Sequence, residues 1–418
     1  MQNKINTSVP SFLNKSIFFA PVWSDNYEKL VRALKKDSRF CCLSKKDAPQ
    51  YMLPYIYRIY RDDQLFMKFE LKSEFLPRLG MCEAQDENGA KAVLKQVIFS
   101  CFSTGCILVE FHVAYEGLTL EEIENFSFHF KSAKKGRDEM LGTVTMEEAV
   151  RALLPAHVNA EIFFTGSDFK KECKMFHQIC LDKVMPEDEI RRHIVHLRRG
   201  YHQNFAIPKM SGEYDIIYEP YSYDRWGGSQ EGIVNIFNYT GEESTDRFLR
   251  NYKPVHLDQN YWFLYIVLLN QRFSTIRYLD KISQMSKYRR KEKEKLSHKI
   301  FKLKTVFSFS VVSDDQLYQN LYSKLYELLD IDRLLADIHD NEEQVEMLQN
   351  HEILESEKRT SAFLFGLSFL SLFSVLVDAA GYFDRIAFLE KIATPLSFCC
   401  SILIIVIYVI WRVYYHFK

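Results

Sequence analysis

The chain reads TSAFLFGLSFLSLFSVLV over residues 360–377 and PLSFCCSILIIVIYVIW over residues 395–411, and these two stretches decide the expected fold. Neither carries a charge, and with a few flanking residues each reaches the ~20 residues that span the hydrocarbon core of a bilayer. The connector, residues 384–394, is short and polar. Thr394 and Pro395 suit the N-cap and first turn of a second helix. The sequence therefore predicts a hairpin of two transmembrane helices.

A long stalk helix is predicted directly before the first span. No Pro or Gly occurs between Ser313 and Gly366, and residues 313–316 (SDDQ) have the form of a capping box. Apolar residues recur in steps of three and four, at Leu317, Leu321, Leu325, Leu328, Ile331, Leu335, Ile338, Val345 and Leu348. Such a seam is typical of a coiled coil, and a helix of this length needs neighbouring helices to cover it. We expect self-association through Leu321, Leu328, Leu335 and the first span.

The order of these parts resembles the CorA-like divalent-cation channel family. In that family a cytosolic α/β domain precedes a stalk helix that continues into the first span, and the second span ends in basic residues. The Gly-Met-Asn signature is absent, and Gly381, Tyr382 and Phe383 occupy the corresponding filter position, which puts magnesium selectivity in doubt. In layout the chain resembles the branch associated with type III CRISPR systems. The resemblance implies a pentamer that responds to a nucleotide messenger made from ATP and S-adenosylmethionine (SAM-AMP).

Composition agrees with a large polar body that carries a small membrane part. The chain has 418 residues and a formal net charge of −1, which argues against direct nucleic-acid binding. The first ten residues lack an apolar signal region, and the nine Cys show no C-x-x-C spacing, as suits a reducing cytosol. Basic residues flank the two spans at Lys358, Arg359, Arg412 and Lys418. They favour a multi-pass protein of the inner (cytoplasmic) membrane with both termini in the cytosol.

The expected fold class is a mixed-sheet α/β cytosolic domain with a stalk helix and two C-terminal transmembrane helices. The α/β sensor domain would occupy residues 1–255, a helical hairpin 256–312, the stalk and first span 313–383, the outer loop 384–394, and the second span with its tail 395–418. Strands are expected at residues 16–23, 65–71, 97–102, 106–115, 161–165 and 175–181, with a β-rich run at 55–60. Helices are expected at residues 26–38 and 186–199, and after capping boxes at Thr119 and Thr145. Hairpin breaks between strands argue against a purely parallel sheet.

A basic helix is the first candidate ligand site. On the helix predicted over residues 186–199, the side chains of Arg191, Arg192, His196 and Arg199 fall within reach of one another. This concentration of donors suits a phosphate or another anion. The alternatives are a solvated basic face paired with acidic neighbours, and a metal site at His193 and His196 that lacks a nearby third ligand in the sequence.

A glycine-dense stretch is the second candidate. Residues 226–232 read WGGSQEG, in which Gly227, Gly228 and Ser229 would let backbone N–H groups approach a phosphate closely. The alternative is a turn between two strands, because the Lys-Ser/Thr ending of a phosphate-binding loop is missing.

The helical part holds one apolar run and two charge-biased runs. Residues 261–269 are apolar all round and too short to span a membrane, so they predict a buried helix. Residues 287–304 hold nine Lys and Arg against two Glu, whereas residues 314–358 hold thirteen Asp and Glu against three basic residues. An antiparallel hairpin would place these charges side by side. The alternative is that the basic run binds anionic headgroups or nucleic acid.

A polar stripe on the first span is the candidate pore lining. It consists of Thr360, Ser368, Ser371, Ser374 and Asp378, which lie within an arc of about 140° at 100° per residue. In a symmetric oligomer Asp378 would form a ring of negative charge that concentrates cations. The alternative is that the serines bond back to carbonyls four residues earlier and allow close helix packing.

The expected function is a homo-oligomeric CorA-like channel gated by its cytosolic domain, an antiviral-defence effector activated by a nucleotide messenger. Its partners would be further copies of the chain, the lipid bilayer, the anionic SAM-AMP-like ligand and a permeant cation. The alternatives are a housekeeping divalent-cation transporter and a non-conducting membrane-anchored sensor or membrane disruptor. No Walker loop, G-x-S-x-G or H-E-x-x-H motif occurs in the sequence, so neither catalysis nor a cofactor is expected.

Overall fold

The structure is a computed structural model. It describes residues 14–43, 45, 49–82, 89–131, 142–163, 173–182, 184–207, 216–285, 288 and 290–383. Its internal contacts divide the chain into two units, Met1–Asn341 and Glu342–Lys418. The first unit is a mixed α/β domain that also includes the helices from residue 243 onward and the start of α12 (Ile331–Phe383).

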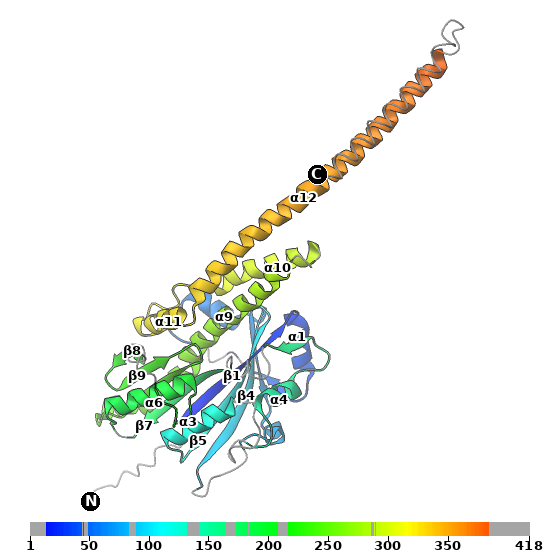
Figure 1. The fold of residues 1–418 in the computed structure, drawn as a ribbon. Helices are drawn as coiled ribbons and strands as arrows, with labels where there is room; N and C mark the ends of the chain where they lie inside the picture. The colour runs from blue at the N-terminus through cyan, green and yellow to red at the C-terminus, as the bar shows by residue number, and fades with distance from the viewer. Residues whose placement is uncertain are drawn as a thin grey trace, which may run out of the picture. The chain divides into compact units, whose positions relative to one another are not determined.

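The described strands form one ten-stranded sheet at the centre of the first unit (Figure 1). They are β1 (Lys15–Ser24), β2 (Phe40–Cys42), β3 (Phe66–Leu71), β4 (Lys91–Phe102), β5 (Cys106–Glu116), β6 (Ala160–Ile162), β7 (Lys174–Leu181), β8 (Ile216–Tyr221), β9 (Asp224–Gly228) and β10 (Gly232–Asn238). The order is β2-β3-β4-β5-β1-β7-β10-β9-β8, and β6 pairs with the end of β1. The β7–β10 pair is parallel, whereas the β1–β5, β1–β7 and β4–β5 pairs are antiparallel. The predicted mixed sheet is therefore confirmed.

Strand β1 shows why the sheet needs a layer of helices on each side. Phe18 and Val22 are buried on one face, and Phe19 and Trp23 are buried on the other. Successive side chains of a strand point to opposite faces, so a strand with buried apolar side chains on both faces must be covered twice.

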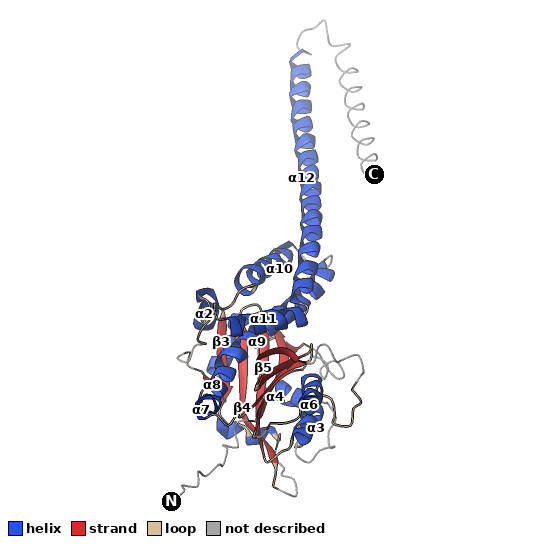
Figure 2. Cartoon of the chain, turned by 90° about the vertical axis from the view of Figure 1, so that its left-hand side faces the viewer, coloured by secondary structure: helices blue, strands red, loops and turns tan. Residues whose placement is uncertain are grey.

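Four helices cover the first face, as Figure 2 shows for α3 and α6. They are α1 (Tyr27–Lys36), α3 (Leu120–Phe130), α4 (Met146–Leu153) and α6 (Glu187–Arg199). Their apolar side chains share one core with Phe18, whose ring centroid lies 4.5 Å from that of Phe130. Both predicted capping boxes are confirmed, because Thr119 and Thr145 exchange hydrogen bonds with Glu122 and Glu148 at the starts of α3 and α4.

Helix α9 (Trp262–Ser283) covers the opposite face. Its Tyr265 ring lies 5.5 Å from Phe19, and its Tyr278 ring lies 5.5 Å from Trp23. The far side of α9 contacts α10 (Arg290–Lys302), α11 (Gln316–Leu328) and the π-helical turn η7 (Leu303–Phe307). Residues 261–269 are all buried as a result, which confirms the prediction of a buried helix in this run.

The remaining helices are short. They are α2 (Pro54–Arg61), α7 (Glu243–Asn251), α8 (Lys253–His256), the π-helical turn η5 (Leu257–Tyr261) and the 3₁₀ turns η1 (Ser73–Phe75) and η2 (Pro77–Leu79). The prediction of a β-rich run at residues 55–60 is wrong, because this segment belongs to α2. Pro54 occupies the first helical position, and Ile56, Ile59 and Tyr60 bury one helical face, so helical spacing outweighs the β-propensity of Ile and Tyr.

The predicted uninterrupted helix from Ser313 is also wrong. Its first part, α11, begins at Gln316 with Asp315 as N-cap, and it ends before Asp330. Asp330 has a φ of 54°, a left-handed conformation that Asp tolerates better than most residues. Two contacts with other parts of the fold support this break: Arg272 of α9 donates to the Leu329 carbonyl, and Gln230 donates to the Asp330 carboxylate.

The seam predicted for self-association lies largely inside this chain. Leu321 and Leu325 of α11 and Ile331 and Ile338 of α12 are buried, because α11 packs against α9 and β8 of the same unit. Leu335 is half-buried. The first half of the seam therefore completes the domain.

The transmembrane part of the predicted fold class is wrong. Over the part of the chain that the structure describes, no helix is both long and apolar enough to cross a membrane. This finding overturns the expected first span and, with it, the ion-channel role and the multi-pass location in the inner membrane. The prediction rested on the absence of charge and on a length of ~20 residues that was reached only by counting flanking residues. The outer loop at 384–394 and the second span at 395–411 lie outside the described residues.

A glycine fixes the turn between β4 and β5 against the end of β1. Gly105 has a φ of 105°, and a Cβ atom there would lie 2.6 Å from the Ser24 carbonyl oxygen. The Ser24 N–H donates to the Gly105 carbonyl at 2.9 Å. Both the left-handed backbone and the close approach therefore require glycine.

We predict that Gly105→Ala lowers the free energy of unfolding by about 2 kcal/mol or more, because it combines backbone strain with a backbone clash. Urea unfolding measures the change. Gly89→Ala is the matched control, since Gly89 has a φ of 81° and no atom of the described residues lies within 4 Å of the added Cβ. Equal losses in the two variants would show that the close approach to Ser24 contributes nothing.

Candidate functional site

The structure places two of the predicted ligand-binding arginines of α6 beside carboxylates. Arg191 Nη2 lies 2.7 Å from Glu187 Oε1 one turn earlier. Arg192 Nη2 lies 3.0 Å from Glu121 Oε1 on α3. Their positive charges are thus already balanced, which favours the alternative of a basic face paired with acidic neighbours.

The other two predicted ligand residues of α6 are also engaged within the fold. His196 is buried, and Arg199 Nη1 donates to the Tyr201 hydroxyl at 3.2 Å. The Arg199 carbonyl accepts from Lys131 at 3.1 Å. The four side chains therefore do not form one open donor face in this structure.

The glycine-dense stretch forms the turn between β9 and β10, as the structural alternative predicted. Ser229 Oγ donates to the Arg198 carbonyl at 2.6 Å and accepts from the N–H groups of Glu231 and Gly232. A Cβ atom at Gly228 would lie 2.7 Å from Leu328 Cδ2, so glycine allows close packing of this turn on α11. Gly227 pairs with Val234 in the β9–β10 ladder.

A buried carboxylate joins α3 to α6. Glu124 is 1% exposed, and its two oxygens lie 2.6 Å from His193 Nδ1 and 2.9 Å from His196 Nδ1. The other ring nitrogen of His196 lies 3.2 Å from the Phe205 carbonyl oxygen. Both ring nitrogens of His196 therefore lie within hydrogen-bond distance of an oxygen atom. The sequence showed the histidines but gave no sign of their partner about seventy residues earlier.

Burial by itself would raise the pKa of Glu124, but hydrogen bonds from His193 and His196 more than offset it and hold the pKa below the usual 4.5. A carboxylate with a lowered pKa in the folded state stabilises the fold fully above its unfolded value. That contribution is lost as the pH falls below about 4.5 through the folded-state pKa.

We predict that Glu124→Gln lowers the free energy of unfolding at pH 7 by about 2 kcal/mol, because the amide has one oxygen acceptor where the buried carboxylate offers one to each imidazole. The loss of stability between pH 4.5 and more acidic conditions should become shallower than in the wild type. Urea unfolding at several pH values measures both effects. Glu121→Gln is the control, because this carboxylate is more exposed, and we expect it to retain the wild-type pH profile.

The predicted pore-lining residues lie on α12. Thr360, Ser368 and Ser371 are exposed, and Ser368 Oγ donates to the Leu364 carbonyl at 2.9 Å. This contact is the back-bonding that the alternative interpretation predicted for the serines. The side chains of Ser374, Asp378, Tyr382 and Phe383 and the surroundings of Gly381 lie outside what the structure describes.

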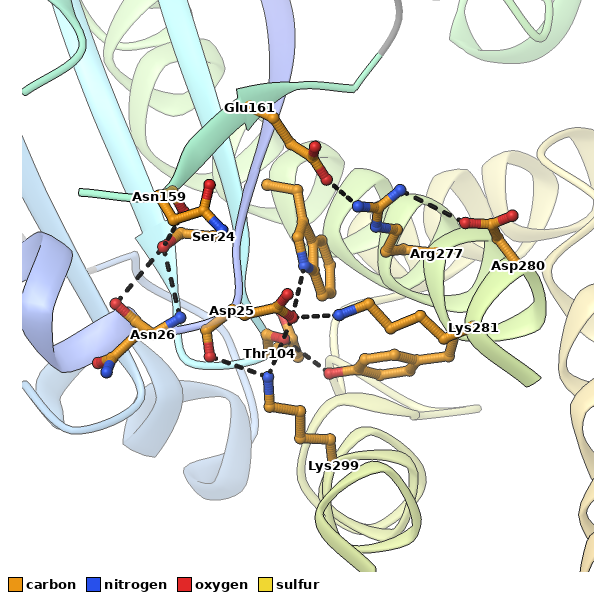
Figure 3. A network of polar contacts seen from close by, with 12 residues as sticks. Ser24, Asp25, Asn26, Thr104, Asn159, Glu161, Arg277, Asp280, Lys281 and Lys299 are labelled. Carbon is orange, nitrogen blue, oxygen red and sulfur yellow. Dashed lines mark hydrogen bonds and ion pairs between the residues drawn. The ribbon is translucent and has the colours of Figure 1, made fainter. Parts of the chain in front are cut away.

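A polar network at the end of β1 connects the sheet to two helices (Figure 3). Asp25 Oδ1 accepts from Trp23 Nε1 at 3.1 Å and from Lys281 of α9. Lys299 of α10 donates to the Asp25 carbonyl at 3.0 Å. A single residue after β1 thus contacts both helices of the second layer. Lys299 belongs to the basic run of residues 287–304, for which the sequence suggested an acidic partner helix. The sequence gave no sign of its contact with Asp25.

Two further residues of α9, Arg277 and Tyr278, extend this network. Arg277 lies between Glu161 of β6 and Asp280, one turn further along its own helix (Figure 3). Tyr278 donates to the Thr104 carbonyl at 2.6 Å, beside the β4–β5 turn. The end of α9 is therefore positioned by polar contacts from β1, β6 and the β4–β5 turn, which makes this region a candidate coupling site between sheet and helices.

Burial would raise the pKa of Asp25, but hydrogen bonds from Lys281 and Trp23 lower it to about 2. The side chain of Asp25 is half-exposed, so solvent screens much of this interaction.

We predict that Asp25→Asn lowers the free energy of unfolding by about 1 kcal/mol and speeds amide hydrogen exchange at the end of α9. Asp280→Asn is the control, because Asp280 is similarly exposed and contacts Arg277 at 3.4 Å without reaching the sheet. Identical exchange in wild type and Asp25→Asn would show that the network does not hold α9 to β1.

Two buried cysteines lie at β7, Cys173 directly before the strand and Cys180 within it. Cys173 and Cys180 point to opposite faces of this strand, and burial raises the pKa of both thiols to about 12. Burial also lowers the pKa of His177 to about 3. Within the described parts of the chain, no three His, Cys, Asp or Glu side chains are arranged to hold a metal ion.

Comparison of the chain with protein-family models, curated proteins and solved structures found no match. The resemblance to CorA-like channels therefore stays a prediction from the order of the parts along the sequence.

Proposed function

We propose that this chain is a ligand-responsive effector, in which the α/β domain regulates helix α12 and α12 joins copies of the chain into a homo-oligomer. The observation that carries the proposal is the way α12 begins. Its first residue, Ile331, is fully buried in the domain, and it directly follows the left-handed Asp330. The helix then continues without interruption to Phe383.

The junction before α12 is held by α9, the helix that covers the second face of the sheet. Arg272 of α9 donates to the Leu329 carbonyl at the end of α11. Gln230, in the β9–β10 turn, donates to Asp330. A displacement of α9 or of this turn therefore acts directly on the residues from which α12 starts, and a ligand that binds the displaced and undisplaced states unequally would shift their populations.

The outer part of α12 supports self-association. Large apolar side chains are between 47% and 67% exposed at Phe363, Leu364, Phe365, Leu367, Leu370, Leu372, Val375 and Leu376. At 100° per residue these positions are spread over about 240° of the helix circumference. An apolar surface of this kind is an interaction site, and one this wide requires more than one neighbour. Further copies of the same helix supply such neighbours with matching surfaces, and the resemblance to CorA-like proteins implies five copies.

We predict that the full chain is a homo-oligomer in mild detergent, which keeps an apolar helix dispersed. We expect Leu370→Glu to shift the oligomer toward the monomer. A charge in the centre of a helix bundle is buried without a partner and destabilises the assembly. Light scattering coupled to size exclusion measures the mass. Lys358→Glu is the control, since Lys358 is exposed and precedes the apolar region, and this variant should keep the wild-type mass. A monomeric wild type would overturn the proposed assembly.

A further inference from the structure

We infer that a hollow beside α2 binds a phosphate-bearing ligand of the nucleotide class through Arg58 and Arg61. The inference rests on the proposed function, because it supplies the ligand site that a regulatory domain needs. The hollow is open to the surface and has a volume of about 700 Å³, within the range of small-molecule sites. It is lined by Met52, Pro54, Tyr57, Arg58, Arg61 and Asp62.

The two arginines are one helical turn apart, so both guanidinium groups project from the same side of α2. Both line the hollow, and among the described residues neither forms an ion pair. This separates them from Arg191 and Arg192 of α6, each of which lies within 3.0 Å of a carboxylate oxygen. The α2 pair therefore offers unneutralised, bidentate donors of the type that bind phosphate.

The carboxylates nearest in sequence have other partners. Asp62 Oδ1 accepts from the Gln64 N–H at 2.8 Å. Asp63 Oδ1 lies 2.8 Å from Lys45 Nζ. Among the described residues neither aspartate forms an ion pair with the arginines, so Arg58 and Arg61 are open to an anionic ligand.

An aromatic ring beside the charges favours a nucleotide over phosphate alone. The Arg61 guanidinium lies 5.3 Å from the centroid of the Tyr57 ring, an Arg–Tyr stack at the wall of the hollow. Met52 and Pro54 add apolar surface beside it. A ligand with a phosphate chain and a flat base matches this combination, because the guanidinium groups bind the phosphates while Tyr57 offers a stacking surface.

Helix α2, which carries the hollow, contacts the segment that leads into α11 and so into α12. The Leu53 N–H donates to the Val312 carbonyl at 2.9 Å, and the Tyr55 ring stacks on Phe309 at 5.2 Å. Val312 and Phe309 belong to the segment that leads into α11. A ligand on α2 therefore acts on the chain that enters α11, from which α12 follows.

The test is a calorimetric titration of the full chain in mild detergent with ATP, inorganic tripolyphosphate and adenosine. We expect ATP and tripolyphosphate to bind, and Arg58→Ala/Arg61→Ala to weaken both by about tenfold or more for each guanidinium removed. The matched control is Arg191→Ala/Arg192→Ala, which removes two paired arginines and should leave both affinities unchanged. Tyr57→Leu should weaken ATP more than tripolyphosphate, because only ATP carries a base to stack.

Several outcomes would overturn the site. They are no binding of ATP or tripolyphosphate to the wild type, an unchanged affinity in Arg58→Ala/Arg61→Ala, and an equal loss in the α6 control. Urea unfolding of each variant separates loss of the site from loss of the fold. If the site is right but the proposed function is wrong, the α2 variant still loses ligand binding. In that case hydrogen exchange in α11 and the mass of the wild-type oligomer are the same with and without ligand.

Discussion

Burial of α9 between the sheet and the outer helices is the constraint on which the rest of the domain depends. The sheet is apolar on both faces, so the face opposite α3 and α6 must be covered, and the aromatic side chains of α9 cover it. Burial of each such side chain contributes roughly 1.5–3 kcal/mol. Polar pairs within the same interface fix its register: Trp262 Nε1 donates to the buried Glu110 at 2.7 Å, and Thr104 donates to Asn270 at 2.7 Å. A shift of α9 along the sheet would leave these buried groups unpaired, which costs more than the pairs contribute.

This constraint also explains why charged groups gather at the edges of the interface. Lys253 is buried against Asp224 and is surrounded by the rings of Trp226, Phe237 and Tyr261 at 5.4 to 5.9 Å. Burial lowers the pKa of Lys253, and the carboxylate of Asp224 opposes that shift. At the other end Asp25 joins β1 to α9 and α10. The helices of the second layer are thus fixed by charge at both ends and by apolar packing between them.

The sequence predicted the elements whose signals are local. Each of these signals lies within a few neighbouring residues. They are the capping boxes at Thr119 and Thr145, the hairpin break between the strands at 97–102 and 106–115, and the apolar run at residues 261–269. The break at Asp330 was missed because its support comes from Arg272 and Gln230, which are distant in sequence. For the same reason the basic residues of α6 were identified but their partners were not. The sequence gave no reason to single out Arg58 and Arg61. Whether an arginine has a carboxylate partner can be seen only after the fold has placed the carboxylates.

The positions of the tryptophans give this interface an optical signature. Trp23, Trp226 and Trp262 are all buried on the face of the sheet that meets α9 or its N-terminal turn. The fourth tryptophan of the chain, Trp411, lies outside the described residues. Indole emission moves to longer wavelength when the ring meets water, and a nearby ammonium such as that of Lys253 perturbs the emission of Trp226. The intrinsic fluorescence of the unlabelled chain is therefore weighted toward the contact between sheet and α9, and it would report movement of that helix in real time.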